Sequence, residues 1–170
     1  MKYADARPLI QSGDLIAESH AEWRTLYDWK VQAVRFFTQS EYCHVALAWP
    51  IGGRLFALES VMPKVRMVPL SSMAKKGFYW VPLGAPMSDA ELEFALSQIG
   101  VGTYSQWLAI VAQVRGIDIN DNAFWECAKY VIRCRALSGI ALGQSAVPSN
   151  VVRCALDLPT TALHFVSDAS

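Results

Sequence analysis

Short apolar runs bounded by turn residues predict β-strands in the first half of the chain, and one run, 64–69, alternates charged and apolar residues. The clearest pair of strands, 43–49 and 54–61, flanks a Pro-Ile-Gly-Gly turn. Further strands are expected at 13–17, 64–69, 78–82 and 162–166. The pattern therefore predicts a small antiparallel sheet that contains this hairpin.

Helical spacing of apolar residues predicts helices elsewhere in the chain. Ser88 and Glu91 form a capping box at the start of one helix. The other expected helices are 22–38, 104–114, one from Asp121 or Asn122 to 137, 150–156, and a short helix or loop at 71–76. A strand-rich middle followed by a helix-rich half predicts a single α+β domain over 1–170, with the sheet packed against helices.

Composition narrows the range of partners. The 170 residues are 53% hydrophobic and 18% charged, and the fifteen basic and fifteen acidic residues cancel. No basic block is present, which argues against nucleic acid as the main partner. No apolar run reaches the length of a membrane span, and the first twelve residues lack the apolar core of a secretory signal. We therefore expect no integral membrane segment, and a protein that is cytoplasmic or exported without a classical signal peptide; the oligomeric state is left open.

The four cysteines contain no Cys-x-x-Cys pair, so neither a zinc site nor any other cofactor is expected. Cys43 and His44 are adjacent in the sequence and offer at most an isolated pair of metal-ligand side chains. Because the chain is neither short nor visibly secreted, free thiols are the default.

Cys127 stands near the start of a predicted apolar helix. A helix N-terminus carries unpaired N–H groups and a partial positive charge, so it favours a thiolate and can hold an oxyanion. A lone cysteine on the apolar side of a helix is more often an inert core residue. A nucleophilic role therefore requires a base and a group that orients the base. The best candidates are His44 and Glu59, both on the predicted hairpin.

The length of the hairpin loop decides whether His44 and Glu59 meet. A two-residue loop at 51–52, or a four-residue loop at 50–53, would place them directly opposite each other. A loop at 52–53 shifts the pairing by two residues but keeps both on one face. An odd loop or a bulge would separate them.

These three residue types suit nucleophilic catalysis. An imidazole takes the thiol proton and later returns it to the leaving group, and a carboxylate on the far ring nitrogen fixes the tautomer. The N–H of Cys127 is the natural oxyanion donor. Tyr42, next to the base, is mainly a packing candidate that is also placed to line a substrate groove.

Three segments, 12–16, 42–49 with 58–60, and 124–131, resemble in order the permuted NlpC-like cysteine hydrolases of the YaeF/YiiX group. The shorter segments 102–104 and 148–152 are similar to stretches that flank the nucleophile in that group. The resemblance implies a circularly permuted papain-like fold with His44 as base, Glu59 as orienting residue and Cys127 as nucleophile.

Relatives in that group cleave peptide or amide bonds, often in bacterial cell-wall peptides, so the expected activity is that of a cysteine peptidase or amidase. Two alternatives remain: a lipid acyl hydrolase or acyltransferase of the same fold, and a non-enzymatic structural or binding module of a larger assembly. Glu126 and Lys129 depart from the residue types expected beside the cysteine, which leaves the substrate open.

Overall fold

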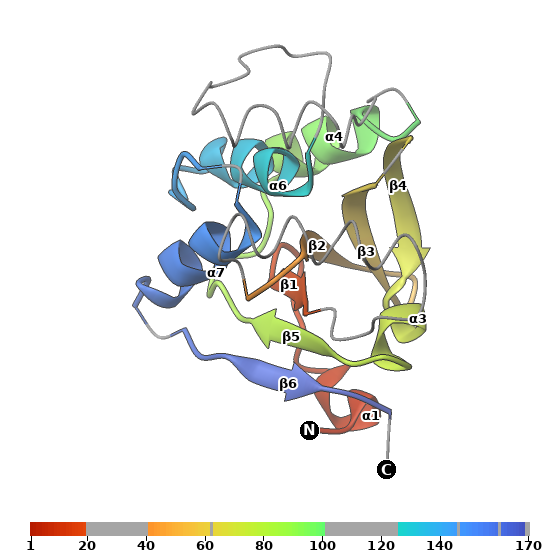
Figure 1. Cartoon of the computed structure of the whole chain (residues 1–170). Helices are drawn as coiled ribbons and strands as arrows, with labels where there is room; N and C mark the ends of the chain where they lie inside the picture. Colours follow the sequence, from red (N-terminus) through yellow and green to blue (C-terminus); the bar gives the residue numbers. More distant parts are fainter. Residues whose placement is uncertain (20–40, 62, 101–125, 146, 160, 169–170) are drawn as a thin grey trace.

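A computed structural model describes residues 1–19, 41–61, 63–100, 126–145, 147–159 and 161–168. Within these ranges six strands form one antiparallel sheet in the order β4-β3-β2-β1-β5-β6 (Figure 1). The strands are β1 (Leu15–Glu18), β2 (His44–Ile51), β3 (Arg54–Val61), β4 (Lys64–Pro69), β5 (Phe78–Val81) and β6 (His164–Val166). The helices are α1 (Tyr3–Ala6), α3 (Leu70–Ala74), α4 (Asp89–Ser97), α6 (Cys127–Ala136) and α7 (Pro148–Leu156).

The predicted α+β class is confirmed, and most predicted elements are found within a few residues of their expected bounds. The capping box of α4 is present: Ser88 Oγ accepts from the Glu91 N–H and the Glu91 carboxylate accepts from the Ser88 N–H. The short helix α1 was not predicted. The predicted helices over 22–38 and 104–114 lie outside the described residues.

The two faces of the sheet carry separate apolar clusters. Helices α4, α6 and α7 pack on one face, and α1 and α3 on the other (Figure 1). Consecutive residues of a strand point to opposite faces, so Leu15 and Ala17 belong to the first cluster and Ile16 to the second. The sheet is thus covered on both sides, and α6 is packed against β2 and β3.

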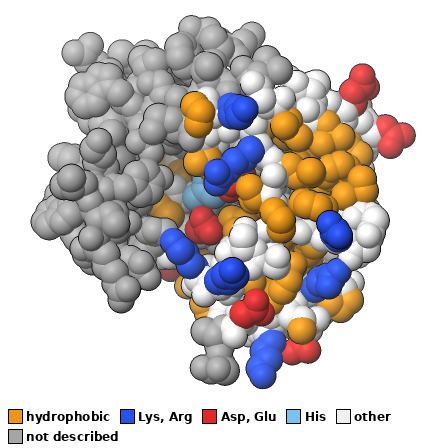
Figure 2. All heavy atoms as spheres, turned by 90° about the vertical axis from the view of Figure 1, so that its right-hand side faces the viewer, with side chains coloured by type: hydrophobic (Ala, Val, Ile, Leu, Met, Phe, Trp, Pro, Cys, Tyr) orange, Lys and Arg blue, Asp and Glu red, His pale blue; other side chains and the backbone are white. Residues whose placement is uncertain are grey.

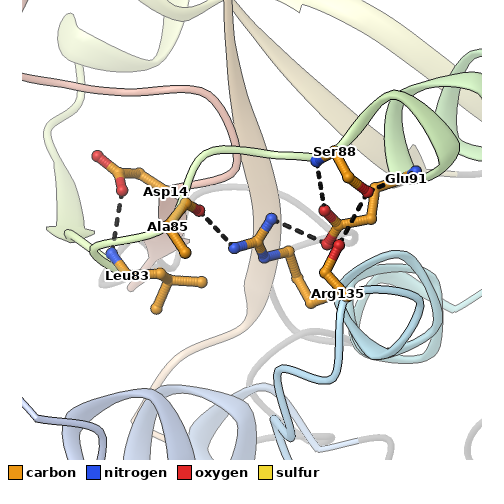
Figure 3. A network of polar contacts seen from close by, with 7 residues as sticks. Asp14, Leu83, Ala85, Ser88, Glu91 and Arg135 are labelled. Carbon is orange, nitrogen blue, oxygen red and sulfur yellow. Dashed lines mark hydrogen bonds and ion pairs between the residues drawn. The ribbon is translucent and has the colours of Figure 1, made fainter.

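A buried ion pair ties α6 to α4. Arg135 on α6 donates from NH1 to Oε1 of Glu91 at 2.9 Å, and neither side chain is exposed to solvent. The other terminal nitrogen of Arg135 donates to the Ala85 carbonyl at 2.6 Å (Figure 3). The remaining Glu91 oxygen accepts from the Ser88 N–H at 2.6 Å. This ion pair therefore holds the C-terminal end of α6, the helix that begins at Cys127, against α4.

Asp14 joins the start of β1 to the segment that follows β5. One carboxylate oxygen accepts from the Gln11 N–H at 2.9 Å and from Trp80 Nε1 at 2.8 Å. The other accepts from the Leu83 N–H at 3.0 Å. These bonds hold the turn before β1 against β5 and the residues after it.

Candidate active site

The β2–β3 hairpin determines how His44 and Glu59 face each other. Ile51 pairs with Arg54 across a two-residue turn formed by Gly52 and Gly53. Both glycines have positive φ angles, 56° and 70°, which a tight hairpin turn of the I′ type requires. This is the predicted alternative that shifts the pairing by two residues. His44 and Glu59 consequently share a face without standing directly opposite each other, and the two registers with direct opposition are wrong.

Despite this offset, the two side chains meet. His44 Nε2 and Glu59 Oε2 lie 2.7 Å apart. The side chains are 14% and 4% exposed, respectively, so water has little access to the contact. The carboxylate therefore occupies one ring nitrogen and leaves Nδ1 for another partner.

Cys127 approaches the same imidazole from α6. It is the first residue of that helix and is 6% exposed. It lies near enough to the His44 ring to raise the pKa of that imidazole. Because Nε2 faces Glu59, Nδ1 is the nitrogen left for the sulfur. The structure thus brings the three predicted residues together, in the order Cys127, His44, Glu59.

The beginning of α6 differs in one detail from the expectation. Its N-cap is Glu126, with an extended backbone, in place of Asp121 or Asn122. The Glu126 side chain makes no capping hydrogen bond, so it does not occupy the donors of the first turn. Burial raises the pKa of the Glu126 carboxyl, and the charge of Lys129 opposes that rise.

Arg66 is a member of this group that sequence reasoning missed. It stands opposite Glu59 in the β3–β4 register, and its Nε donates to Glu59 Oε1 at 2.7 Å. Its own side chain is 52% exposed. A signal was present in the sequence: two residues separate the predicted strands 54–61 and 64–69, and a two-residue turn pairs position 59 with position 66.

The surroundings shift the titration of both hairpin residues. Burial alone would lower the pKa of His44, but hydrogen bonds and charge from Cys127 and Glu59 raise it well above its ordinary value of 6.5. Burial alone would raise the pKa of Glu59, but His44 and Arg66 together lower it. The surroundings therefore favour a protonated ring beside the Glu59 carboxylate, the state that His44 reaches when it accepts a proton from Cys127.

The other three cysteines have different surroundings. Cys134 is completely buried on α6, and burial raises its pKa to about 12, so it remains a thiol. Cys43 donates from its sulfur to the Glu18 carbonyl at 3.2 Å, and it is partly buried. Cys154 is also partly buried.

Tyr42 lies in the core. Its side chain belongs to the apolar cluster beneath α6, with 5% of the residue exposed, and its ring packs edge-on against Tyr79. Packing is therefore its observed role, and a contact with substrate stays a prediction. His164 on β6 packs against Trp80, with ring centroids 4.9 Å apart.

In the ranges that the structure describes, no cluster of three or more His, Cys, Asp or Glu side chains could hold a metal ion. None of the helices described there has the length and apolarity to cross a bilayer.

Comparison with known proteins shows a likeness in fold. No known family profile matches the sequence, and no curated protein matches it significantly. The crystal structure of metalloprotein YiiX from Escherichia coli O157:H7, assigned to DUF1105, superposes with a TM-score of 0.60 and 14% sequence identity. The match covers 91% of this chain and 96% of YiiX. At this level of identity the likeness concerns the fold alone, and it agrees with the resemblance to the YaeF/YiiX group.

Proposed function

We propose that this protein is a cysteine peptidase or amidase with a circularly permuted papain-like fold of the NlpC type. Cys127 is the nucleophile, His44 the general base and acid, and Glu59 the residue that orients the imidazole. The observation that carries the proposal is the grouping of three residues from a helix start and a hairpin far apart in sequence. His44 lies 2.7 Å from Glu59, and Cys127 acts on the same imidazole and raises its pKa.

Each member has a position suited to its step. His44 Nδ1 takes the proton from the Cys127 thiol, and the sulfur attacks the carbonyl carbon of the substrate. The C–S bond forms while the carbonyl π electrons move to oxygen, and the N–H of Cys127 stabilises that oxyanion. Glu59 keeps the second ring nitrogen protonated and balances the imidazolium charge.

The intermediate then collapses, and the C–N bond breaks. The amine leaves with the proton that His44 returns, and a thioester to Cys127 remains. A water molecule gives a proton to His44 and attacks the thioester, whose C–S bond breaks to release the carboxylic acid. The proton on His44 then returns to the sulfur, which closes the cycle.

The location of Cys127 also supports a nucleophilic role over an inert one. It opens a ten-residue helix whose N-cap side chain leaves the first turn uncapped, so the partial positive charge of the helix acts on the sulfur. Cys134, two turns further along α6, lacks both features and is completely buried.

Alkylation tests this proposal without knowledge of the substrate. Intact protein is treated with limiting iodoacetamide at neutral pH, and the modified cysteines are identified by peptide mass spectrometry. Cys127 is expected to react first and Cys134 last. The variant Cys43→Ser is the matched control, because it removes a partly buried thiol next to His44 and should leave the fast phase intact. Equal labelling of all four thiols would contradict the proposal.

Turnover then identifies the bond that is cleaved. Stem-peptide amides from bacterial cell walls and short-chain lipid esters are compared as substrates of the wild type and Cys127→Ala. We expect amide cleavage by the wild type and none by the variant, with unchanged circular dichroism. Preferential cleavage of the lipid esters would move the assignment to acyl transfer or acyl hydrolysis. Turnover by Cys127→Ala would exclude Cys127 as the nucleophile.

A further inference from the structure

We propose that Arg66 is a positioning residue of this site, which holds Glu59 ionised and turned toward His44 and so extends the reactivity of Cys127 to lower pH. The inference rests on the proposed function, because it assigns a role within the same series of residues. It concerns a side chain that is hydrogen-bonded to Glu59, and that acts on the imidazole through this carboxylate.

The first argument is geometric. Each oxygen of the Glu59 carboxylate has a different partner: Oε2 has the His44 ring and Oε1 has Nε of Arg66, both at 2.7 Å. The two partners come from the strands on either side of β3. Contacts from two sides fix the rotation of the carboxylate plane, which a single contact to His44 would leave free.

The second argument is electrostatic. Glu59 is 4% exposed, and a carboxylate removed from water is costly to ionise without compensating charge. In the described part of the chain, the charged groups that act on it are His44 from β2 and Arg66 from β4. Cys127, from α6, reaches it only through the imidazole. Arg66 is therefore the one permanent positive charge on Glu59 in these ranges.

Protonation of Glu59 would disable the base. A neutral carboxyl group would donate its proton to Nε2 of His44, and the neutral ring would then carry its own proton on Nδ1. That nitrogen faces Cys127, so it could no longer accept the thiol proton. Keeping Glu59 ionised is thus a condition for the reactive pair, and Arg66 meets it from the protein surface.

The exposed position of Arg66 provides a matched control. Arg66 lies on β4, at the side of the molecule where Figure 2 shows basic side chains distributed among hydrophobic ones. Lys64 is exposed on the same strand and, by strand alternation, on the same face, two residues away. It pairs with Val61, whereas Arg66 pairs with Glu59. Removing its charge changes the local field without changing the contact.

The experiment measures the rate of Cys127 alkylation by iodoacetamide between about pH 4 and pH 9, a range that spans the ordinary pKa values of glutamate and cysteine. In Arg66→Met we expect the midpoint of the rate profile to move up by about one pH unit, the size typical of losing one close opposite charge. Lys64→Met should leave the midpoint near that of the wild type. Arg66→Lys keeps the charge but lacks the planar guanidinium, so its midpoint should lie between that of Arg66→Met and that of the wild type.

A Glu59→Gln background distinguishes an effect of the Arg66–Glu59 contact from a general effect of the Arg66 charge. If Arg66 acts through Glu59, then Arg66→Met should cause no further shift in a Glu59→Gln protein. An equal shift in Lys64→Met, or a full shift in the Glu59→Gln background, would overturn the proposal. So would an unmoved midpoint in Arg66→Met with native circular dichroism.

The two proposals fail in distinguishable ways. If Cys127 in the wild type reacts no faster than the other cysteines, the proposed function fails. If Cys127 reacts fastest and its profile is the same with and without Arg66, the function stands and only the role of Arg66 is lost.

Discussion

Glu59 Oε2 lies 2.7 Å from His44 Nε2, in a contact that is almost closed to water. The pairing of β2 with β3 sets the two residues two positions out of direct opposition, yet both project from the same face of the hairpin. The contact fixes which ring nitrogen faces the helix that carries Cys127. The hairpin therefore determines the tautomer of the base as well as its location.

This relationship predicts the effect of removing the Glu59 charge. The variant Glu59→Gln keeps the size of the side chain but no longer balances an imidazolium, so the thiolate–imidazolium state becomes less favourable. We expect the alkylation rate of Cys127 at neutral pH to fall by roughly tenfold or more, the change that corresponds to one pKa unit. The control is Glu18→Gln, which removes an equal charge from the strand position that pairs with His44. A similar fall in that control would contradict a specific role for Glu59.

The same pair predicts how folding stability depends on pH. The pKa of Glu59 is lowered by folding, so its contribution is complete above the ordinary value of 4.5 and is lost as the pH falls through the folded value. The pKa of His44 is raised, so its contribution is complete below 6.5 and is lost as the pH rises through the folded value. Both contributions are present together between 4.5 and 6.5.

Urea unfolding checks this dependence. The free energy of unfolding of the wild type is compared across pH with that of a His44→Gln, Glu59→Gln double variant, so that other titrating groups cancel. The difference should be largest between 4.5 and 6.5 and should shrink in both directions. A difference that stays constant from acid to alkaline pH would show that the pair does not titrate as described.

Local patterns in the sequence predicted much of the site because hairpins are local structures. Residue type and the turn signal between them identified β2 and β3, and alternation identified β4; the bounds expected for β3 and β4 are those found. The glycine pair made a two-residue turn one of the predicted options. Alternation then placed His44 and Glu59 on one face, without any long-range information. The start of α6 was less visible, because Glu126 is not a residue type that marks an N-cap strongly.

Contacts between distant segments were not predictable in the same way. The buried pair of Arg135 and Glu91 joins residues 44 positions apart, and in the sequence each belongs to an ordinary amphipathic helix. No feature of the neighbouring sequence distinguishes a buried arginine of this kind from a solvent-exposed one. Arg66 is an intermediate case, since its pairing with Glu59 follows once β3 and β4 are paired with Val61 opposite Lys64.

The buried pair leads to a prediction about stability. Arg135→Met leaves Glu91 without its partner in a fully buried position, and we expect a loss of about 3–5 kcal/mol in the free energy of unfolding. Combining it with Glu91→Gln should restore part of that loss, because the uncompensated charge is then absent. Arg153→Met, at an exposed position of α7, should change stability by no more than about 0.5 kcal/mol. If Arg135→Met behaved like this control, the ion pair would not anchor α6.

The glycine at the start of β1 should be more sensitive to substitution than those in the hairpin turn. Gly13 and Gly53 both have positive φ angles, 83° and 70°. A Cβ on Gly53 would meet no atom within 4 Å. Gly53→Ala should therefore cost only the backbone term, which is the roughly 1–2 kcal/mol that a residue with a side chain loses at a positive φ angle. A Cβ on Gly13 would lie 2.6 Å from NH1 of Arg135, which cannot move aside without breaking its bond to Glu91.

Gly13→Ala should therefore add an overpacking cost of about 1–3 kcal/mol to the backbone term. Urea unfolding of the two alanine variants measures the difference. In an Arg135→Met background the clash with the guanidinium is removed, although Met87 still lies 2.8 Å from the added Cβ. The two changes should then be less than additive, because Arg135 contributes to both losses. Equal losses in Gly13→Ala and Gly53→Ala would mean that the turn before β1 can relax away from α6, and that the ion pair does not fix the two against each other.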